Sequence, residues 1–203
     1  IKMLTTLLFP TKGQILWEGE DIRALGAEYR GLLGYLPQQF GYYPGYTPRQ
    51  FLRYAAALQC IPKREADGRI DHLLETVGLG DAADKKMKKF SGGMLQRAAA
   101  ALLLALHPRY ILADEPTSAL DAENRTLLLE LLEKQRETAG ILFISHDVAA
   151  LRALCGTVYV MEHGMLTEQG TMQELLEHPK QAWTKEYAAA NHPVSREGWT
   201  WTD

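Results

Sequence analysis

The chain has 203 residues, with 22 Lys and Arg against 25 Asp and Glu, so its formal net charge is −3. That balance argues against a protein that coats nucleic-acid phosphates, and a hydrophobic content of 46% excludes a disordered chain. The longest apolar run, residues 98–106, is far shorter than the roughly 20 residues that a membrane-spanning helix needs.

The first 47 residues predict short elements joined by turns. Residues 1–8 have helical spacing, and residues 14–17 predict a short strand. Residues 21–29 predict a short helical or irregular stretch, and residues 32–36 a buried strand. A loop rich in glycine, tyrosine and proline follows over residues 38–48.

Residues 48–89 have helical patterns and no strand signal, so we expect a helical subdomain there. Pro48 suits the first position of a helix, and a second helix fits residues 63–77, ended by Gly78. The apolar residues that give the first helix its amphipathic pattern are Phe51, Tyr54, Ala55 and Leu58.

From residue 91 onward, predicted strands and helices alternate, which favours an α/β fold with a mostly parallel sheet flanked by helices. The predicted strands cover residues 110–113, 141–145, 158–161 and 166–169. The predicted helices cover residues 94–106, with Ser91 as the N-cap, 122–138, 148–154 and 171–190. After residue 191 the composition is that of a loop, and we expect Trp199 and Trp201 to be exposed. Cys60 and Cys155 lack CxxC spacing, and we expect both to be buried, reduced thiols.

Two carboxylates, Asp114 and Glu115, close a short apolar strand. Ligands bind at the carboxyl ends of parallel strands, where an aspartate can hold Mg²⁺ and a glutamate can accept a hydrogen bond from an attacking water. A solvated acidic turn is the alternative for two acidic residues taken alone.

Three further signals have equally ordinary alternatives. Residues 91–93, Ser-Gly-Gly, open a helix whose free N–H groups can bind an anion, or they are a plain N-cap. His146 follows a strand and can donate to a phosphate, or it is a surface histidine. Gln38 follows a strand and Pro37, and taken alone it indicates nothing.

The order of these signals resembles the nucleotide-binding domain of ATP-binding cassette (ABC) proteins, from Ile1 to about Glu177. The matching motifs are the Q-loop at residues 36–38, the signature motif at 90–97, Walker B with the catalytic glutamate at 111–115, the D-loop at 118–121 and the switch histidine, His146. Phe90 and Met94 stand where the commonest signature has Leu and Gln, and the Ser-Gly-Gly core is intact.

The resemblance implies a P-loop nucleoside triphosphatase fold with an inserted helical subdomain that carries the signature motif. It divides the chain into an ATPase core (residues 1–47 and 90–180), a helical subdomain (48–89) and a C-terminal tail (181–203). It also implies two cofactors, ATP and Mg²⁺.

The resemblance also assigns roles in ATP hydrolysis. Glu115 would polarise the attacking water, and His146 would contact the γ-phosphate. Asp114 would support Mg²⁺, with Gln38 sensing the metal and the water. In a head-to-tail pair of such domains, the signature residues would bind the partner's γ-phosphate and the D-loop aspartate would cross the interface; these are Ser91, Gly92, Gly93 and Asp121.

One family motif is missing from these residues, because no GxxxxGK[ST] occurs among them. Residues 1–15 resemble the continuation of the helix that follows this Walker A motif. We therefore expect an N-terminal truncation before or at Walker A, and a chain that is inactive alone, with exposed apolar sheet edges and poor solubility.

The resemblance favours a transporter ATPase subunit that works with a membrane permease subunit and a second nucleotide-binding domain. It places the protein peripherally at the cytoplasmic face of the plasma membrane and implies no nucleic-acid partner. The alternatives are a non-transport ABC ATPase and a non-catalytic remnant. The interval between Gln38 and Ser91 has no heptad run, and the chain has one cassette and no charged linker, which speaks against the relatives that act on chromosomes or ribosomes.

Overall fold

The computed structural model describes residues 1–58, 60–118 and 120–191. The chain divides into two compact units, Ile1–His146 and Asp147–Asp203, and each is described by itself. In those described ranges, no helix combines the length and the apolarity needed to cross a membrane. The expected exposure of Trp199 and Trp201 concerns positions outside the described residues.

A three-stranded parallel sheet forms the centre of the first unit. Its strands are β3 (Leu33–Leu36), β4 (Tyr110–Asp114) and β5 (Gly140–Ile144), in the order β3-β4-β5. The predicted strands agree with these bounds to within one residue at each end. The middle strand is the most buried, since Ile111 and Ala113 are fully buried. The α/β fold with a parallel sheet and flanking helices is thereby confirmed.

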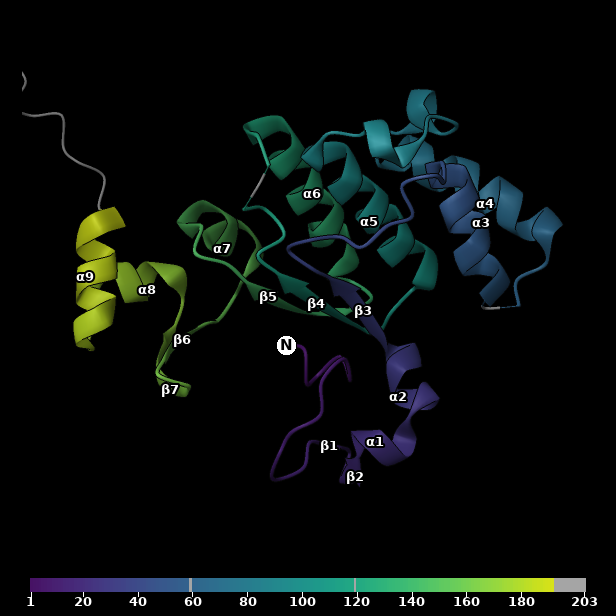
Figure 1. Ribbon diagram of the computed structural model, residues 1–203. Helices are drawn as coiled ribbons and strands as arrows, with labels where there is room; N and C mark the ends of the chain where they lie inside the picture. The colour runs from purple at the N-terminus through teal and green to yellow at the C-terminus, as the bar shows by residue number, and fades with distance from the viewer. Residues whose placement is uncertain (59, 119, 192–203) are drawn as a thin grey trace, which may run out of the picture. The chain divides into compact units, whose positions relative to one another are not determined.

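Helix α5 (Gly92–Leu106) packs against β3, and α6 (Ala122–Gln135) packs against α5 (Figure 1). Gly34 in β3 allows the close approach, because a Cβ there would collide with the side chains of Leu103 and Pro108. A run of alanines and leucines on α5 is buried as a result. Helix α6 ends three residues before the predicted end.

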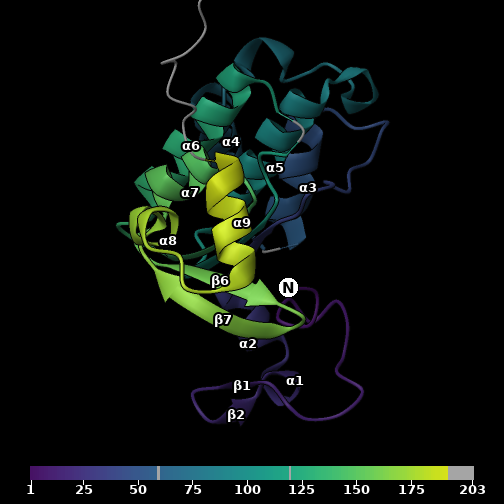
Figure 2. The same cartoon turned by 90° about the vertical axis from the view of Figure 1, so that its left-hand side faces the viewer.

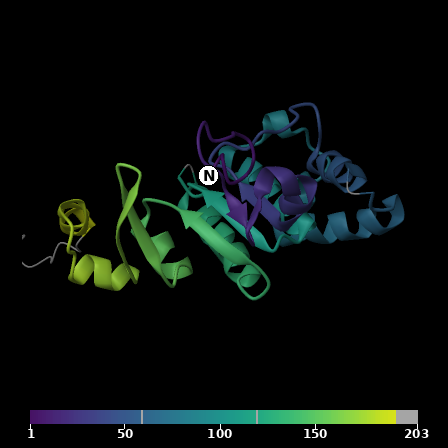
Figure 3. The same cartoon turned by 90° about the horizontal axis from the view of Figure 1, so that it is seen from below.

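The helical region contains α3 (Pro48–Leu58) and α4 (Lys63–Thr76), drawn in blue in Figure 3, and two short 3₁₀ turns, Gly80–Ala82 and Met87–Lys89. Both long helices contact α5 as well as each other. No strand occurs among the described residues of this region, as predicted. Arg49 pairs with Asp71 and Asp84, and Arg53 pairs with Asp67, so the exposed side of the region is held by ion pairs.

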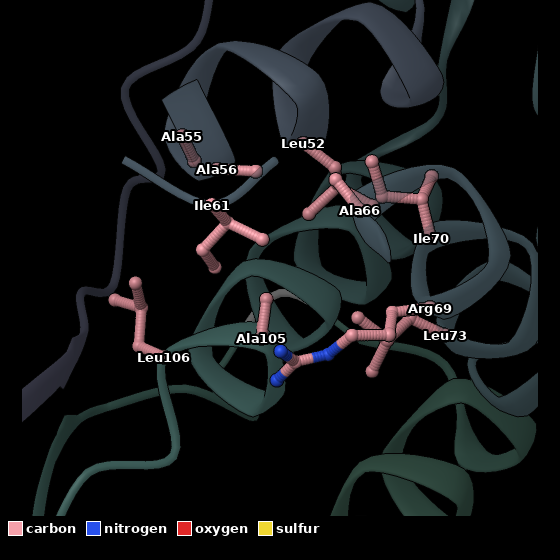
Figure 4. A pocket seen from close by; sticks show the side chains of 10 residues that line it. All are labelled: Leu52, Ala55, Ala56, Ile61, Ala66, Arg69, Ile70, Leu73, Ala105 and Leu106. Atoms are coloured by element: carbon pink, nitrogen blue, oxygen red, sulfur yellow. The ribbon is translucent and has the colours of Figure 1, made fainter. Parts of the chain in front are cut away.

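A small apolar pocket with a cavity volume of about 20 Å³ lies among α3, α4 and α5 (Figure 4). Its walls are mainly alanine, leucine and isoleucine side chains. The lining residues are Leu52, Ala55, Ala56, Ile61, Ala66, Arg69, Ile70, Leu73, Ala105 and Leu106.

The N-terminal segment differs from the prediction. Residues 1–8 form turns rather than a helix, and Thr6 has a left-handed φ of 59°. Short isolated helices need a buried face to be stable, and here Leu7 and Leu8 are exposed. The segment leads into a hairpin of β1 (Leu16–Trp17) and β2 (Glu20–Asp21).

Two short helices, α1 (Ile22–Leu25) and α2 (Ala27–Leu32), connect this hairpin to β3. The Trp17 ring packs against Tyr110, at the start of β4, with the ring centroids 4.8 Å apart. The hairpin is thereby fixed to the start of the central strand.

The second unit contains α7 (Val148–Leu154), an antiparallel pair of strands, β6 (Val158–Glu162) and β7 (Met165–Gly170), and then α8 (Met172–Glu177) and α9 (Ala182–Asn191) (Figure 2). The single helix predicted over residues 171–190 is wrong, because the chain breaks between α8 and α9. Pro179 disfavours helical backbone at His178, which has φ −132° and ψ 51°. Glu168 then accepts hydrogen bonds from the backbone N–H groups of Lys180 and Gln181 just before α9.

The predicted burial of the two cysteines is also wrong. Neither cysteine forms a disulfide in the structure, but Cys60 is exposed and Cys155 is half-buried. Cys60 follows the end of α3 in a tight turn with a φ of 57°, and that turn lies on the surface.

Candidate functional site

The carboxyl ends of the three parallel strands bring the predicted catalytic segments to one edge of the sheet. Leu36 pairs with Ala113, and Asp114 pairs with Ile144. Gln38, Glu115 and His146 lie one or two residues beyond these pairs. Backbone hydrogen bonding of the sheet therefore brings together segments that are far apart in the sequence.

Glu115 and His146 form the closest pair at this edge. Glu115 Oε1 lies 3.0 Å from His146 Nδ1, and the Glu115 side chain is 23% exposed whereas that of His146 is 75% exposed. The other oxygen, Glu115 Oε2, is buried and has no hydrogen-bond partner in the structure. A buried acceptor without a partner is costly unless a donor such as water occupies the site, so Oε2 is ready to accept from a bound molecule.

The backbone at Glu115 is unusual. Its φ is 47°, in the left-handed region that a non-glycine residue rarely adopts. Its N–H donates to the carbonyl of Ile144 (2.9 Å), which continues the strand pairing past the end of β4. The hydroxyl of Ser118 donates to the Glu115 carbonyl (3.0 Å). The residue is thus held from both sides in a conformation that costs free energy, as is common at functional sites.

Asp114 and Gln38 lie on the β3 side of the edge. Tyr35, in β3, points its hydroxyl toward Asp114 Oδ2 at 3.4 Å, a long and therefore weak contact. Burial, followed by the negative charge of Asp114, raises the pKa of Tyr35 above its ordinary value. Gln38 Nε2 lies 3.5 Å from the Ser118 hydroxyl, so the two segments are adjacent without a strong bond.

The segment of Ser91, Gly92 and Gly93 begins α5. The Ser91 hydroxyl accepts a hydrogen bond from the Met94 backbone N–H (3.3 Å), so the predicted N-cap is confirmed. Ser91 and Gly92 are exposed, whereas Gly93 is buried. The exposed helix start leaves backbone N–H groups open to an anion.

Asp121 is the N-cap of α6, and Asn124 is its partner. Asp121 accepts from the Asn124 backbone N–H (2.9 Å) and from the Asn124 side chain (2.8 Å and 2.9 Å). The backbone hydrogen bond of Asn124, followed by the side-chain hydrogen bond, holds the pKa of Asp121 below its ordinary value. Asp121 is therefore a fixed, ionised carboxylate.

The roles of Tyr35 and Asn124 were not predicted from the sequence. An N-cap aspartate followed three residues later by a side-chain donor is a recognisable helix-start pattern, so the sequence could have indicated the role of Asn124. No sequence pattern could have indicated Tyr35, because its contact with Asp114 depends on the register of two strands.

Within the part of the chain that the structure describes, no three His, Cys, Asp or Glu side chains gather as a metal-binding group. Asp114 and Glu115 are the acidic side chains at the strand ends.

The family model described as ABC transporter matches residues 1–118. The chain belongs to the ABC transporter family. Among curated ABC relatives, the chain is 37% identical over 175 residues to the uncharacterized ABC transporter ATP-binding protein YxlF of Bacillus subtilis (strain 168), covering 86% of this chain. It is 34% identical over 197 residues to the methionine import ATP-binding protein MetN of Corynebacterium jeikeium (strain K411), covering 94% of this chain. The chain spans 58% and 54% of the length of these relatives.

Solved structures of ABC proteins share the fold. An ATP-binding subunit of an ABC transporter superposes with a TM-score of 0.74 at 27% identity, covering 86% of this chain and 73% of that chain. The structure of cbiO1 from Clostridium perfringens, described as part of the ABC transporter complex cbiONQ, gives a TM-score of 0.72 at 27% identity, covering 87% and 73%.

Proposed function

We propose that this chain is part of an ATP-hydrolysing subunit of an ABC transporter that drives transport through separate membrane subunits. The observation that carries the proposal is the Glu115–His146 pair beside Asp114 at the carboxyl edge of the parallel sheet. Phosphoryl transfer needs mainly positioning and neutralisation of charge. This edge offers a carboxylate to orient water (Glu115), a carboxylate to bind a metal ion (Asp114) and an imidazole (His146).

The side-chain oxygens at this edge fit Mg²⁺. Asp114 would hold the metal directly or through water, since Mg²⁺ prefers oxygen ligands and keeps several waters. Gln38 would contact the metal and the attacking water from the β3 side. The bound Mg²⁺ supplies positive charge against the phosphate oxygens.

The hydrolytic step is assigned to the Glu115–His146 pair. Glu115 Oε2, buried without a partner, accepts from the attacking water. His146 would donate Nδ1–H to Glu115 Oε1 and, in its doubly protonated form, would donate Nε2–H to the γ-phosphate.

The signature segment binds the ATP that a second nucleotide-binding domain holds. Ser91 and Gly92 are exposed at the start of α5, where helix N–H groups attract the γ-phosphate of an ATP held by the partner. Asp121 is exposed and ionised, which suits a residue at the interface between two domains. The functional division we propose is a core of residues 1–47 and 90–180, a helical subdomain of 48–89 and a tail of 181–203.

The membrane subunit docks on an aromatic surface formed by Tyr43, Tyr46 and Tyr54. These side chains are 50%, 38% and 41% exposed, and the Tyr43 ring lies 5.1 Å from Tyr46 and 5.7 Å from Tyr54. A hollow beside it is lined by two cationic side chains, of which Arg53 is already paired with Asp67 and Lys86 is not, and by no carboxylate. It is lined by Gly45, Tyr46, Gln50, Arg53, Tyr54 and Lys86. This chemistry suits a partner segment with an apolar anchor and an acidic side chain. Docking on such a membrane subunit is our reason for proposing a peripheral position at the cytoplasmic side of the membrane.

Charge reversal at Lys86 tests the docking surface. We expect Lys86→Glu to weaken co-purification with the membrane subunit at least about tenfold, because a like charge then faces the partner's acidic side chain. Lys85→Glu is the matched control, since Lys85 is exposed but does not line the hollow. Equal effects of the two variants would contradict the docking assignment.

The 203 residues contain no GxxxxGK[ST] sequence, the loop that holds the triphosphate in this family. We therefore expect this polypeptide by itself to bind ATP weakly and to show no turnover. Isothermal titration with ATP and Mg²⁺ measures this directly, and tight binding by the 203-residue polypeptide would contradict it.

The decisive test of the function is Glu115→Gln in the full-length gene product that contains this sequence. We expect ATP binding to persist and turnover to fall by about 10²–10⁴-fold, because the amide replaces the carboxylate that polarises the water. Glu130→Gln, an exposed position on α6, is the control and retains turnover. Turnover by Glu115→Gln within twofold of the unaltered protein would overturn the assignment.

A further inference from the structure

The buried glycine of the signature segment lies directly against the side chain of Asn124. A Cβ built on Gly93 would lie 2.7 Å from Asn124 Cγ and 2.7 Å from Asn124 Nδ2. Real Cβ atoms do not approach this closely, so any larger residue at position 93 would displace Asn124.

Asn124 holds Asp121 by its backbone N–H, which would remain after a side-chain displacement, and by its side chain, which would not. Its side-chain nitrogen donates to both carboxylate oxygens of Asp121, at 2.8 Å and 2.9 Å. Displacement of Asn124 would break these charge-assisted hydrogen bonds, which are among the stronger kinds. A larger side chain at position 93 would therefore disturb the D-loop aspartate, Asp121, through one intervening side chain, that of Asn124.

The two signature glycines have different surroundings. Gly92 is exposed at the helix start, whereas Gly93 is buried and faces Asn124. Close approach of a phosphate explains a glycine at an exposed position, but a buried glycine is explained by what packs on it.

We propose that Gly93 must be glycine in order to seat Asn124, and that Asn124 is a positioning residue that fixes the Asp121 carboxylate and couples the signature segment to the D-loop segment. The consequences for ATP turnover rest on the proposed function. The packing relation itself does not.

A double-mutant cycle in the full-length gene product tests the coupling. We expect Gly93→Ala to lower kcat at least about tenfold in the unaltered background, because it displaces the Asn124 side chain and removes its two hydrogen bonds to Asp121. In the Asn124→Ala background, where the obstruction is gone, Gly93→Ala should change kcat by less than twofold. An equal loss in both backgrounds would show that Gly93 acts by phosphate approach alone and would overturn the proposal.

Gly92→Ala is the matched control. Gly92 is exposed at the helix start, so the effect of this substitution on kcat should be the same in the unaltered and the Asn124→Ala backgrounds. Coupling of Gly92→Ala to Asn124 as strong as that of Gly93→Ala would also overturn the proposal.

Thermal unfolding of the same variants separates this inference from the proposed function. Gly93→Ala should lower Tm by roughly 3–10 °C with Asn124 present, and by much less in the Asn124→Ala background. Additive Tm shifts would overturn the packing relation whether or not the protein hydrolyses ATP. Non-additive shifts in a protein without ATPase activity would support it while refuting the function.

Discussion

The strand ends and the helix starts of the first unit hold the candidate site residues in different ways. Asp114 and Glu115 continue a fully paired, buried central strand, so the main chain fixes their position. Ser91 and Asp121 begin α5 and α6, where each side chain caps its own helix by a hydrogen bond.

A substitution at the strand ends should therefore alter chemistry without altering stability, whereas a substitution at the helix starts should alter both. At the strand ends a side chain can change while the backbone pairing stays intact. At the helix starts the group that would meet a ligand also satisfies a backbone N–H, so a substitution alters both.

The largest effect on stability is expected beneath the strand ends. Ile111 in β4 is fully buried, and Ile111→Ala should lower the free energy of unfolding by about 2–5 kcal/mol through lost burial and the cavity left behind. Denaturant titration of the full-length protein measures this. Leu58→Ala, at an α3 position that is 68% exposed and outside the sheet, is the control and should cost below about 1 kcal/mol. Similar costs at the two positions would contradict the assignment of the core.

A smaller effect is expected at the start of α5. Ser91→Ala removes the acceptor for the Met94 N–H and should cost about 0.5–2 kcal/mol, measured by the same titration. Ser91→Thr keeps a hydroxyl at the N-cap and should retain most of the stability. If alanine and threonine were equally tolerated, the hydroxyl would not be the cap.

The Asp121 cap should give a pH-dependent effect. Its folded-state pKa is lowered by the hydrogen bonds from Asn124, so its ionised form stabilises the fold above the unfolded pKa of about 4, and this contribution is lost as the pH falls through the folded value. Asp121→Asn keeps the cap but removes the charge. We expect the unaltered protein to have the higher Tm at pH 7, with a difference that shrinks below about pH 4. A difference that grows as the pH falls would contradict the sign.

The smallest effect on stability is expected at Glu115, the position to which we assign the catalytic carboxylate. Glu115→Gln keeps the size of the side chain and the backbone bond to Ile144, so the free energy of unfolding should stay within about 0.5 kcal/mol. Equilibrium unfolding measures it beside the loss of turnover. A large destabilisation would show that Glu115 supports the fold and would remove the contrast between the two regions.

Much of the fold could be predicted from local patterns. The apolar runs that became β3, β4 and β5 are short and bounded by turn residues, and Ser91 stands at a readable helix start. The helix predicted over residues 1–8 is wrong because helical spacing alone does not supply the buried face that a short helix requires. The break at Pro179 was readable, since proline restricts the residue before it, but the polar composition around it favoured one long helix.

The sequence by itself determined the order of the motifs, the α/β class and the residue types available for phosphate chemistry, because each is written in local composition and spacing. The tertiary structure alone decided which groups meet. The 3.0 Å contact of Glu115 with His146 depends on the register of β4 and β5, and the contact of Gly93 with Asn124 depends on how α5 packs on α6. Register and helix packing are set by non-local pairing of buried surfaces, which no single segment of the chain encodes.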